Sequence, residues 1–164
     1  MTESLTKELN NLSLFSRNKH GGGKNTNANG LKFEKTINFK YNILKNVKTK
    51  KYEVNSIELL DIKNRKFIYP QTKKSFYSYL ENKGYVDLKV IKGHGCKQPD
   101  KCLIDEENKI IYLFEIKFQK VSGSVCEKLQ TAPFKIYNYK QCIPDFKINY
   151  IYLLNDYFEK KCKA

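Results

Sequence analysis

The sequence has few of the residues that build metal sites of the zinc-finger type. It contains only two histidines, His20 and His94, and no two of its cysteines form a C-x-x-C pair. A structural zinc site needs four such ligands in clustered pairs, so it is not expected, and a metal shared by His94 and Cys96 is the less favoured alternative. An odd number of unclustered cysteines indicates reduced thiols in a reducing intracellular compartment, either the cytoplasm or the nucleus or nucleoid. The five cysteines are Cys96, Cys102, Cys126, Cys142 and Cys162.

Long hydrophobic runs are also missing. The longest, Ile110–Phe114, is far too short to span a bilayer, and the first 14 residues include Glu3 and Glu8 but no apolar stretch typical of a secretory signal. We therefore expect neither a membrane protein nor a secreted one. Tryptophan is absent, yet hydrophobic residues make up 40% and aromatic residues 13% of the 164-residue chain. That composition is sufficient for one packed core.

Acidic residues are the scarcer charge. The chain has 31 Lys and Arg against 17 Asp and Glu, which gives a formal net charge of +14. Such an excess on a small domain indicates a polyanionic partner, most commonly nucleic acid. The alternative is a solvated, lysine-rich surface that reflects only the base composition of an AT-rich genome.

The N-terminal part is predicted to be a polar arm that precedes a single domain. Residues 1–28 are polar and contain Gly21–Gly23, but they do not satisfy the phosphate-loop pattern G-x-x-x-x-G-K-[ST]. Residues 29–164 are predicted to form one catalytic domain. It opens with a helix that has Asn29 as N-cap and Glu34 in its first turn. The apolar positions that suggest this helix are Leu31, Phe33, Ile37, Tyr41 and Leu44.

Short strands and helices follow. Thr72 and Gly84 are typical of the start and end of one helix. Ser124 and Glu127 form a capping box that opens another, which Pro133 interrupts or restarts. Besides the hairpin described next, the predicted strands are 57–62, 66–69, 85–91 and 146–154.

Residues 93–117 predict an antiparallel hairpin around the polar segment 106–109. If the turn is centred between positions 107 and 108, paired residues have numbers that add to 215, and Asp100 lies directly opposite Glu115. Their Cβ atoms would then be about 5 Å apart on one face of the sheet. Lys117 follows on the face of Glu115, because side chains alternate along a strand. Ile111 and Leu113 share that face, whereas Tyr112, Phe114 and Ile116 point to the other one, so the strand is predicted to be central and covered.

Two opposed carboxylates at the end of a covered strand repel each other and lose hydration. A divalent cation between them would remove that cost, and hard oxygen ligands with room for water and phosphate suit Mg²⁺. A neighbouring lysine can position a phosphate or an attacking water. Together these groups favour phosphodiester hydrolysis.

Pro99-Asp100, followed after a strand-length interval by Glu115-Ile116-Lys117, resembles the PD-(D/E)XK nuclease superfamily, and in particular its type II restriction endonuclease members. The resemblance implies an α/β restriction-endonuclease-like core with a central mixed β-sheet flanked by helices. It implies that Asp100 and Glu115 bind Mg²⁺, which Mn²⁺ can replace, and that Lys117 activates water. Glu34, on an early helix, would complete the catalytic and metal-binding set.

Two further stretches resemble restriction-type members, and their residues are predicted to contact DNA. Gln119 continues the face of Glu115, and the Ser122-Gly123-Ser124 turn offers backbone N–H groups to a phosphate. The predicted DNA-binding residues are Lys97, Gln98, Gln119, Ser122, Ser124 and Lys128.

The sequence thus predicts a Mg²⁺-dependent endonuclease of duplex DNA, sequence-specific and restriction-like. The family resemblance implies that it leaves 5′-phosphate and 3′-hydroxyl ends. A palindromic target would favour a homodimer, since two-fold DNA is matched by a two-fold protein. A homing endonuclease, a Holliday junction resolvase and a repair nickase are alternatives with the same fold. A non-catalytic nucleic-acid-binding protein and a viral or phage structural protein are alternatives of other classes.

Overall fold

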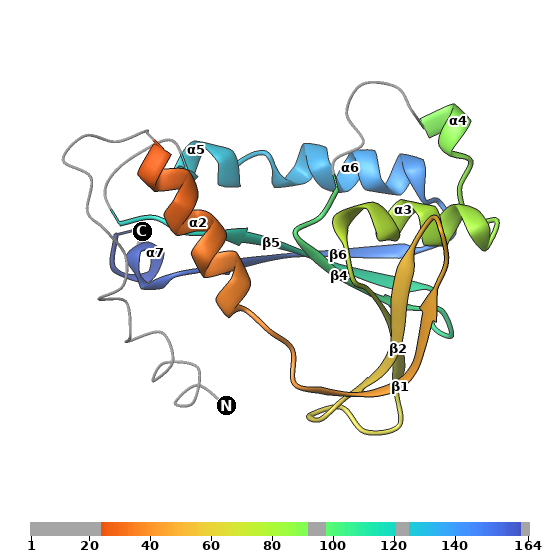
Figure 1. The fold of residues 1–164 in the computed structure, drawn as a ribbon. Coiled ribbons are helices and arrows are strands. Elements are labelled where there is room, and N and C mark those ends of the chain that lie inside the picture. The colour runs from red at the N-terminus through yellow and green to blue at the C-terminus, as the bar shows by residue number, and fades with distance from the viewer. Residues whose placement is uncertain (1–23, 92–97, 121–124, 162–164) are drawn as a thin grey trace. The chain divides into compact units, whose positions relative to one another are not determined.

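The computed structural model describes residues 24–91, 98–120 and 125–161, and it shows an α/β fold. Six strands form one mixed sheet in the order β1-β2-β3-β4-β5-β6, flanked by helices (Figure 1). This confirms the predicted α/β class and the central mixed sheet. The strands are β1 (Tyr41–Lys48), β2 (Glu53–Leu59), β3 (Lys66–Pro70), β4 (Lys101–Asp105), β5 (Ile110–Lys117) and β6 (Lys147–Leu154). The helices are α2 (Lys24–Thr36), α3 (Lys73–Asn82), α4 (Leu88–Ile91), α5 (Val125–Leu129), α6 (Ala132–Cys142) and α7 (Asp156–Lys161).

The chain divides into two compact units. Unit 1 comprises residues 1–37, 116–129 and 153–164, and unit 2 comprises residues 38–115 and 130–152. Unit 2 therefore holds β1 to β4, most of β5 and β6, and the helices α3, α4 and α6, whereas α2, α5 and α7 belong to unit 1.

The hairpin of β4 and β5 has the predicted register. Its antiparallel pairs run from Lys101 opposite Phe114 to Asp105 opposite Ile110, and residues 106–109 form the turn. The turn closes with Lys109 at a φ of 53°, a left-handed conformation that few non-glycine residues adopt. The ladders β1–β2, β2–β3 and β3–β4 are antiparallel as well.

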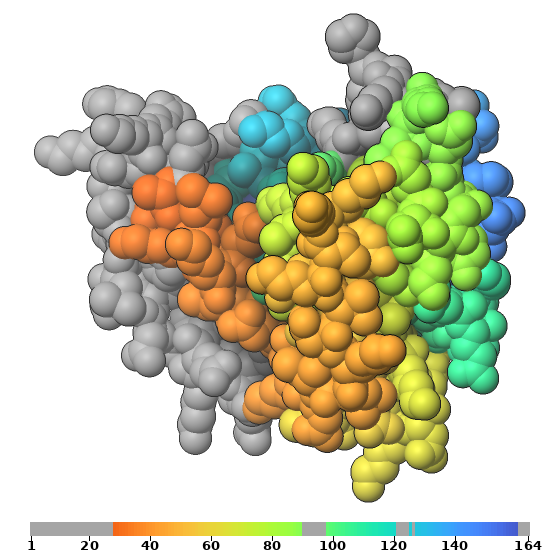
Figure 2. Space-filling model, turned by 45° about the vertical axis from the view of Figure 1, so that its right-hand side comes forward, coloured from red at the N-terminus to blue at the C-terminus, as the bar shows by residue number. Residues whose placement is uncertain are grey.

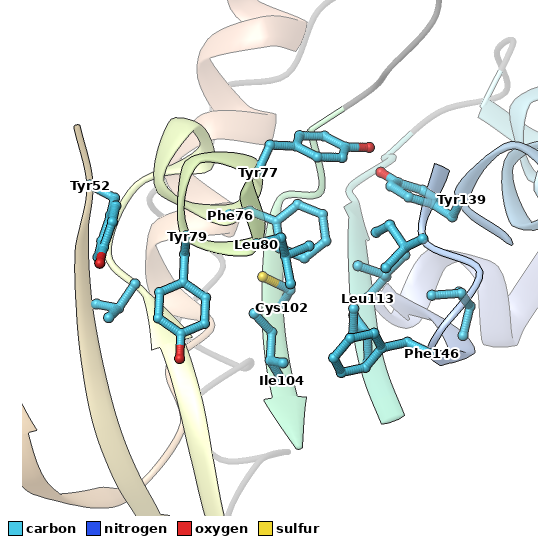
Figure 3. Packing of buried hydrophobic residues seen from close by; sticks show 14 residues of the cluster. Tyr52, Phe76, Tyr77, Tyr79, Leu80, Cys102, Ile104, Leu113, Tyr139 and Phe146 are labelled. Atoms are coloured by element: carbon cyan, nitrogen blue, oxygen red, sulfur yellow. The ribbon is translucent and has the colours of Figure 1, made fainter. Parts of the chain in front are cut away.

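Helices α3 and α6 pack against one face of the sheet in unit 2. Phe76 and Leu80 of α3 are fully buried against β4 and β5, where Ile104 and Leu113 are also fully buried (Figure 3). The opposite face has its own cluster around Ile57, Phe67 and Leu103, to which Tyr112 and Phe114 contribute. β5 is therefore apolar and covered on both faces within unit 2, as predicted.

Local signals explain the ends of α3. The Thr72 side chain accepts a hydrogen bond from the backbone N–H of Ser75, which confirms Thr72 as the N-cap. At the other end Gly84 has a φ of 76°, and its N–H donates to the carbonyl of Glu81. A left-handed residue that ends a helix in this way is favoured to be glycine, because glycine has no Cβ to clash.

Strand β1 is the edge of the sheet and lies at the surface of unit 2, shown in orange in Figure 2. Six of its residues are exposed, among them Ile43 and Leu44, which are 58% and 47% exposed. The ladder with β2 is irregular between Ile43 and Lys45, and exposed lysines follow along the strand. A bulge and lysines are devices that discourage further strand pairing at a sheet edge.

Unit 1 has a smaller core of its own. The rings of Phe33 from α2 and Phe118 lie 5.4 Å apart between centroids, and Ile116 packs with them. Beside this cluster, the Asn155 side chain accepts from the Gln119 N–H and donates to the Gln119 carbonyl, both at 2.9 Å. Asn155 thereby provides hydrogen-bond partners for the backbone N–H and carbonyl of Gln119, which follows the end of β5.

The prediction for the first helix is wrong in its limits. α2 begins at Lys24, so Asn29 is a buried residue inside the helix and not its N-cap, and residues 24–28 of the predicted arm are helical. Tyr41 and Leu44 belong to strand β1. Their spacing continues the helical period by coincidence across the loop that separates the two elements.

The predicted strand at 85–91 is also wrong. Asp87 accepts a hydrogen bond from the N–H of Lys89 at 2.8 Å and thereby opens the short helix α4. A side chain that satisfies a local N–H competes with strand pairing. Tyr85 packs instead against Phe146, with 4.9 Å between ring centroids.

Two other predictions hold. A helix before Pro133 and a second one from Ala132 confirm that the proline restarts the helix, and β6 confirms the last strand. Among the described residues, no helix combines the length and the apolar character needed to cross a bilayer.

Candidate functional site

Two carboxylates lie at the open end of the β4–β5 hairpin, the end away from its turn. Asp100 directly precedes β4, and Glu115 directly follows Phe114, the last residue of β5 that pairs with β4. Carried one residue beyond its last pair, Lys101 and Phe114, this register would set Asp100 opposite Glu115. Their side chains are 14% and 16% exposed, so both charges are largely withdrawn from water.

Each carboxylate has a lysine beside it. Lys73 Nζ of α3 lies 2.7 Å from Asp100 Oδ1, and Lys135 Nζ of α6 lies 3.0 Å from Glu115 Oε1. The Lys73 side chain is 42% exposed, whereas that of Lys135 is 10% exposed. Lys135 is thus a nearly buried ammonium group, which proteins tolerate only when it is paired.

The same arrangement of residues on both helices aims these lysines at the sheet. Tyr77 follows Lys73 by four residues, and Tyr139 follows Lys135 by four, so each tyrosine lies on the same helix face as its lysine. Tyr77 and Tyr139 are 6% and 4% exposed, which identifies that face as the one turned to the core. Figure 3 shows the two tyrosine hydroxyls pointing toward each other from α3 and α6.

Tyr150 of β6 completes the surroundings of Glu115. Burial, together with the negative charge of Glu115, raises the pKa of Tyr150 well above its ordinary value. Lys135 Nζ lies 5.8 Å from the centre of the Tyr150 ring. The Tyr150 hydroxyl is buried, and within the described part of the chain it has no hydrogen-bond partner of normal geometry.

These side chains fit a cation that takes few protein ligands. Mg²⁺ keeps several waters and binds proteins through one or two carboxylates plus substrate phosphates. Asp100 and Glu115 supply two hard oxygen donors, and across residues 24–91, 98–120 and 125–161 no group of three or more Asp, Glu, His or Cys converges. Carboxylate oxygens are the type of ligand that Mg²⁺ prefers, and the binding of Mg²⁺ here stays a prediction.

Two other predicted catalytic residues belong to unit 1. Lys117 ends β5, and its Nζ donates to the Ile116 carbonyl at 3.3 Å. Glu34 is half-buried in the last turn of α2, so the prediction that it lies in a first turn is wrong. The catalytic roles of Lys117 and Glu34 stay predictions.

The predicted DNA-binding residues are in varied settings. Gln98 is exposed, Lys128 is exposed on α5, and Gln119 is 6% exposed with its backbone bound to Asn155. Lys97, Ser122 and Ser124 lie outside the described residues. The predicted capping box depends on Ser124, so it also lies outside them.

Sequence reasoning missed Lys73 and Lys135. Both were counted only within the excess of surface lysine, although each stands four residues before a tyrosine on a predicted helix. A lysine in line with the buried face of a helix departs from the usual polar pattern, and that signal was available from the sequence.

Neither the protein-family models nor the curated proteins nor the solved structures include a match to this chain.

Proposed function

We propose that this protein is a Mg²⁺-dependent endonuclease that hydrolyses phosphodiester bonds of duplex DNA, with the sequence specificity and homodimeric action of a type II restriction enzyme. The observation that supports it best is the β4–β5 register, which ends one residue before Asp100 and Glu115, two largely buried carboxylates with lysines beside them. The net charge of +14 suits a DNA partner, because lysines that neutralise phosphates release counterions.

The residues have distinct proposed roles. Asp100 and Glu115 hold Mg²⁺, with Glu34 as a further proposed carboxylate. Bound Mg²⁺ supplies Lewis acidity and lowers the pKa of a water molecule. Lys117, two residues after Glu115 in the same strand, orients the attacking water. A restriction-endonuclease-like core is the proposed arrangement of strands and helices that goes with these roles.

The test is cleavage of a long, sequence-diverse DNA by the purified protein in Mg²⁺, with the ends mapped by sequencing. We expect discrete ends from the wild type and a loss of cleavage of at least about 100-fold for Asp100→Ala and for Lys117→Ala. Glu107→Ala, an exposed acid in the turn of the same hairpin, and Lys140→Ala, an exposed lysine on α6, are the matched controls. Wild-type cleavage by both Asp100→Ala and Lys117→Ala would refute the site assignment.

A nucleic-acid-binding protein without turnover is the second candidate. It is favoured by the same two ion pairs, because Lys73 and Lys135 neutralise the carboxylates in the absence of any metal. Salt-sensitive binding of duplex DNA, with no cleavage in either Mg²⁺ or Mn²⁺, would support this candidate over the enzyme. Random nicks would indicate a repair or degradative nuclease instead of a sequence-specific one.

A further inference from the structure

The two lysines beside the carboxylates have no role in the predicted catalytic set. Lys73 pairs with Asp100 and Lys135 pairs with Glu115, so in each pair one positive charge faces one negative charge. Each ammonium group lies where a cation bound to the same carboxylate oxygen would repel it, since like charges about 4 Å apart interact strongly even when water partly screens them. Mg²⁺ and a lysine ammonium group therefore cannot both occupy these positions without an electrostatic cost.

We propose that Lys73 and Lys135 act as exchangeable counter-ions: they neutralise Asp100 and Glu115 until Mg²⁺ binds, and they then bind the phosphate oxygens of the DNA backbone. This inference rests on the proposed function. It names the chemical class that the lysines recognise, a phosphodiester anion, and it makes them substrate-positioning residues. No covalent bond changes in the exchange.

Charge explains why metal and DNA would bind together. Mg²⁺ in place of the two ammonium groups at the carboxylates adds two positive charges at this place, and an anion can then pair with the two lysines. A phosphodiester then meets two charge-assisted donors as well as the metal. Binding of metal and of DNA must therefore strengthen each other by the same factor.

The surroundings of the lysines support this exchange. Lys73 is 42% exposed on a flexible stem at the start of α3, so it can move without disturbing the core. Lys135 is held more tightly, but the buried Tyr150 hydroxyl beside Glu115 has no protein partner of normal geometry in the described residues. A phosphate or water oxygen at this place would satisfy that hydroxyl.

The experiment titrates the full-length protein with Mg²⁺ alone by calorimetry, for the wild type, Lys73→Met and Lys135→Met. If the lysines compete with the metal, each variant binds Mg²⁺ about tenfold more tightly than the wild type. Lys74→Met and Lys140→Met are matched controls from the same two helices, because both lysines are exposed and neither takes part in the two ion pairs. We expect wild-type Mg²⁺ affinity from both controls.

A second measurement follows the binding of a DNA duplex of about 25 base pairs in the presence of Ca²⁺. In most Mg²⁺ enzymes Ca²⁺ occupies the metal site but does not support turnover. Lys73→Met and Lys135→Met are expected to weaken this binding about tenfold and to lower its salt dependence, and the controls are not. Should Lys135→Met fail to fold, Lys73→Met carries the test alone, since its side chain lies outside the core.

Unchanged or weaker Mg²⁺ affinity in the variants overturns the inference, and so does the absence of Mg²⁺ binding in every form of the protein. The proposed function is judged separately, by cleavage of DNA by the wild type. A protein that exchanges lysine for Mg²⁺ but does not cut DNA would uphold this inference and refute the nuclease.

Discussion

The β4–β5 hairpin carries acidic residues at both ends, and these residues differ in their burial and in their partners. At the turn, the side chain of Asp105 is completely buried and forms an ion pair with Arg65. Asn108 adds its backbone N–H at 2.9 Å and its side-chain amide at 3.0 Å and 3.1 Å. At the open end, Asp100 and Glu115 are 14% and 16% exposed, and a lysine from a helix contacts each of them.

The difference lies in the partners. The planar guanidinium of Arg65 and the turn amide of Asn108 satisfy Asp105 with fixed donors that come from the hairpin and the neighbouring loop. Lysine offers a compact, strongly hydrated charge on a flexible stem, with donors that can rotate. The turn end therefore has the properties of a structural site, whereas the open end is the place of the proposed cation exchange.

The largest effect is expected where the network is fixed. Asp105→Ala should lower the free energy of unfolding by about 3 kcal/mol, because it removes the buried acceptor of the hydrogen bonds from Arg65 and Asn108, each worth about 1.5 kcal/mol. Asp100→Ala should lower it by about 1 kcal/mol or less, since the Lys73 side chain is 42% exposed and can return to water. Urea denaturation of both variants measures the contrast, and equal losses would show that the two ends are energetically alike.

The pH dependence of stability should come partly from the turn end. Burial by itself would raise the pKa of Asp105, but hydrogen bonds from Arg65 and Asn108 outweigh burial and hold the pKa below its ordinary value of 3.8. A carboxyl group with a lowered folded-state pKa stabilises the protein above 3.8, and this contribution is lost as the pH falls through the folded value. Urea midpoints between pH 5 and pH 2 should therefore drop for the wild type more steeply than for Asp105→Asn. Parallel profiles would mean that Asp105 does not contribute.

Asn108→Ala should cost less than the loss of Asp105. It removes the side-chain amide but keeps the backbone N–H and Arg65, so we expect a loss of about 1.5 kcal/mol, as for one hydrogen bond to a charged group. In the Asp105→Ala background the same substitution should cost almost nothing, because the two residues share one network. A double-mutant cycle in urea measures this coupling, and full additivity would argue against it.

The contrast between the ends also explains how far the sequence could predict them. Alternation and the polar turn were sufficient for the hairpin and its register, because strand geometry is local and has a fixed period of two. The first helix was misplaced because its apolar period ran on by chance into β1. Lys73 and Lys135 come from helices 27 and 20 residues away along the chain, so their contacts depend on packing that no local pattern encodes.

The smallest expected effect tests whether the open end is satisfied by protein alone. The buried Tyr150 hydroxyl has no hydrogen-bond partner of normal geometry among the described residues, although Glu115 lies close enough to raise its pKa. Removal of an unsatisfied buried hydroxyl is neutral or favourable, so Tyr150→Phe should change the free energy of unfolding by less than about 1 kcal/mol, in the stabilising direction. Tyr152→Phe, two residues further along the same strand, is the control for loss of a hydroxyl as such. A clear destabilisation by Tyr150→Phe alone would mean that the hydroxyl is bound to Glu115, and the open end would then resemble the fixed network around Asp105 more than an exchangeable one.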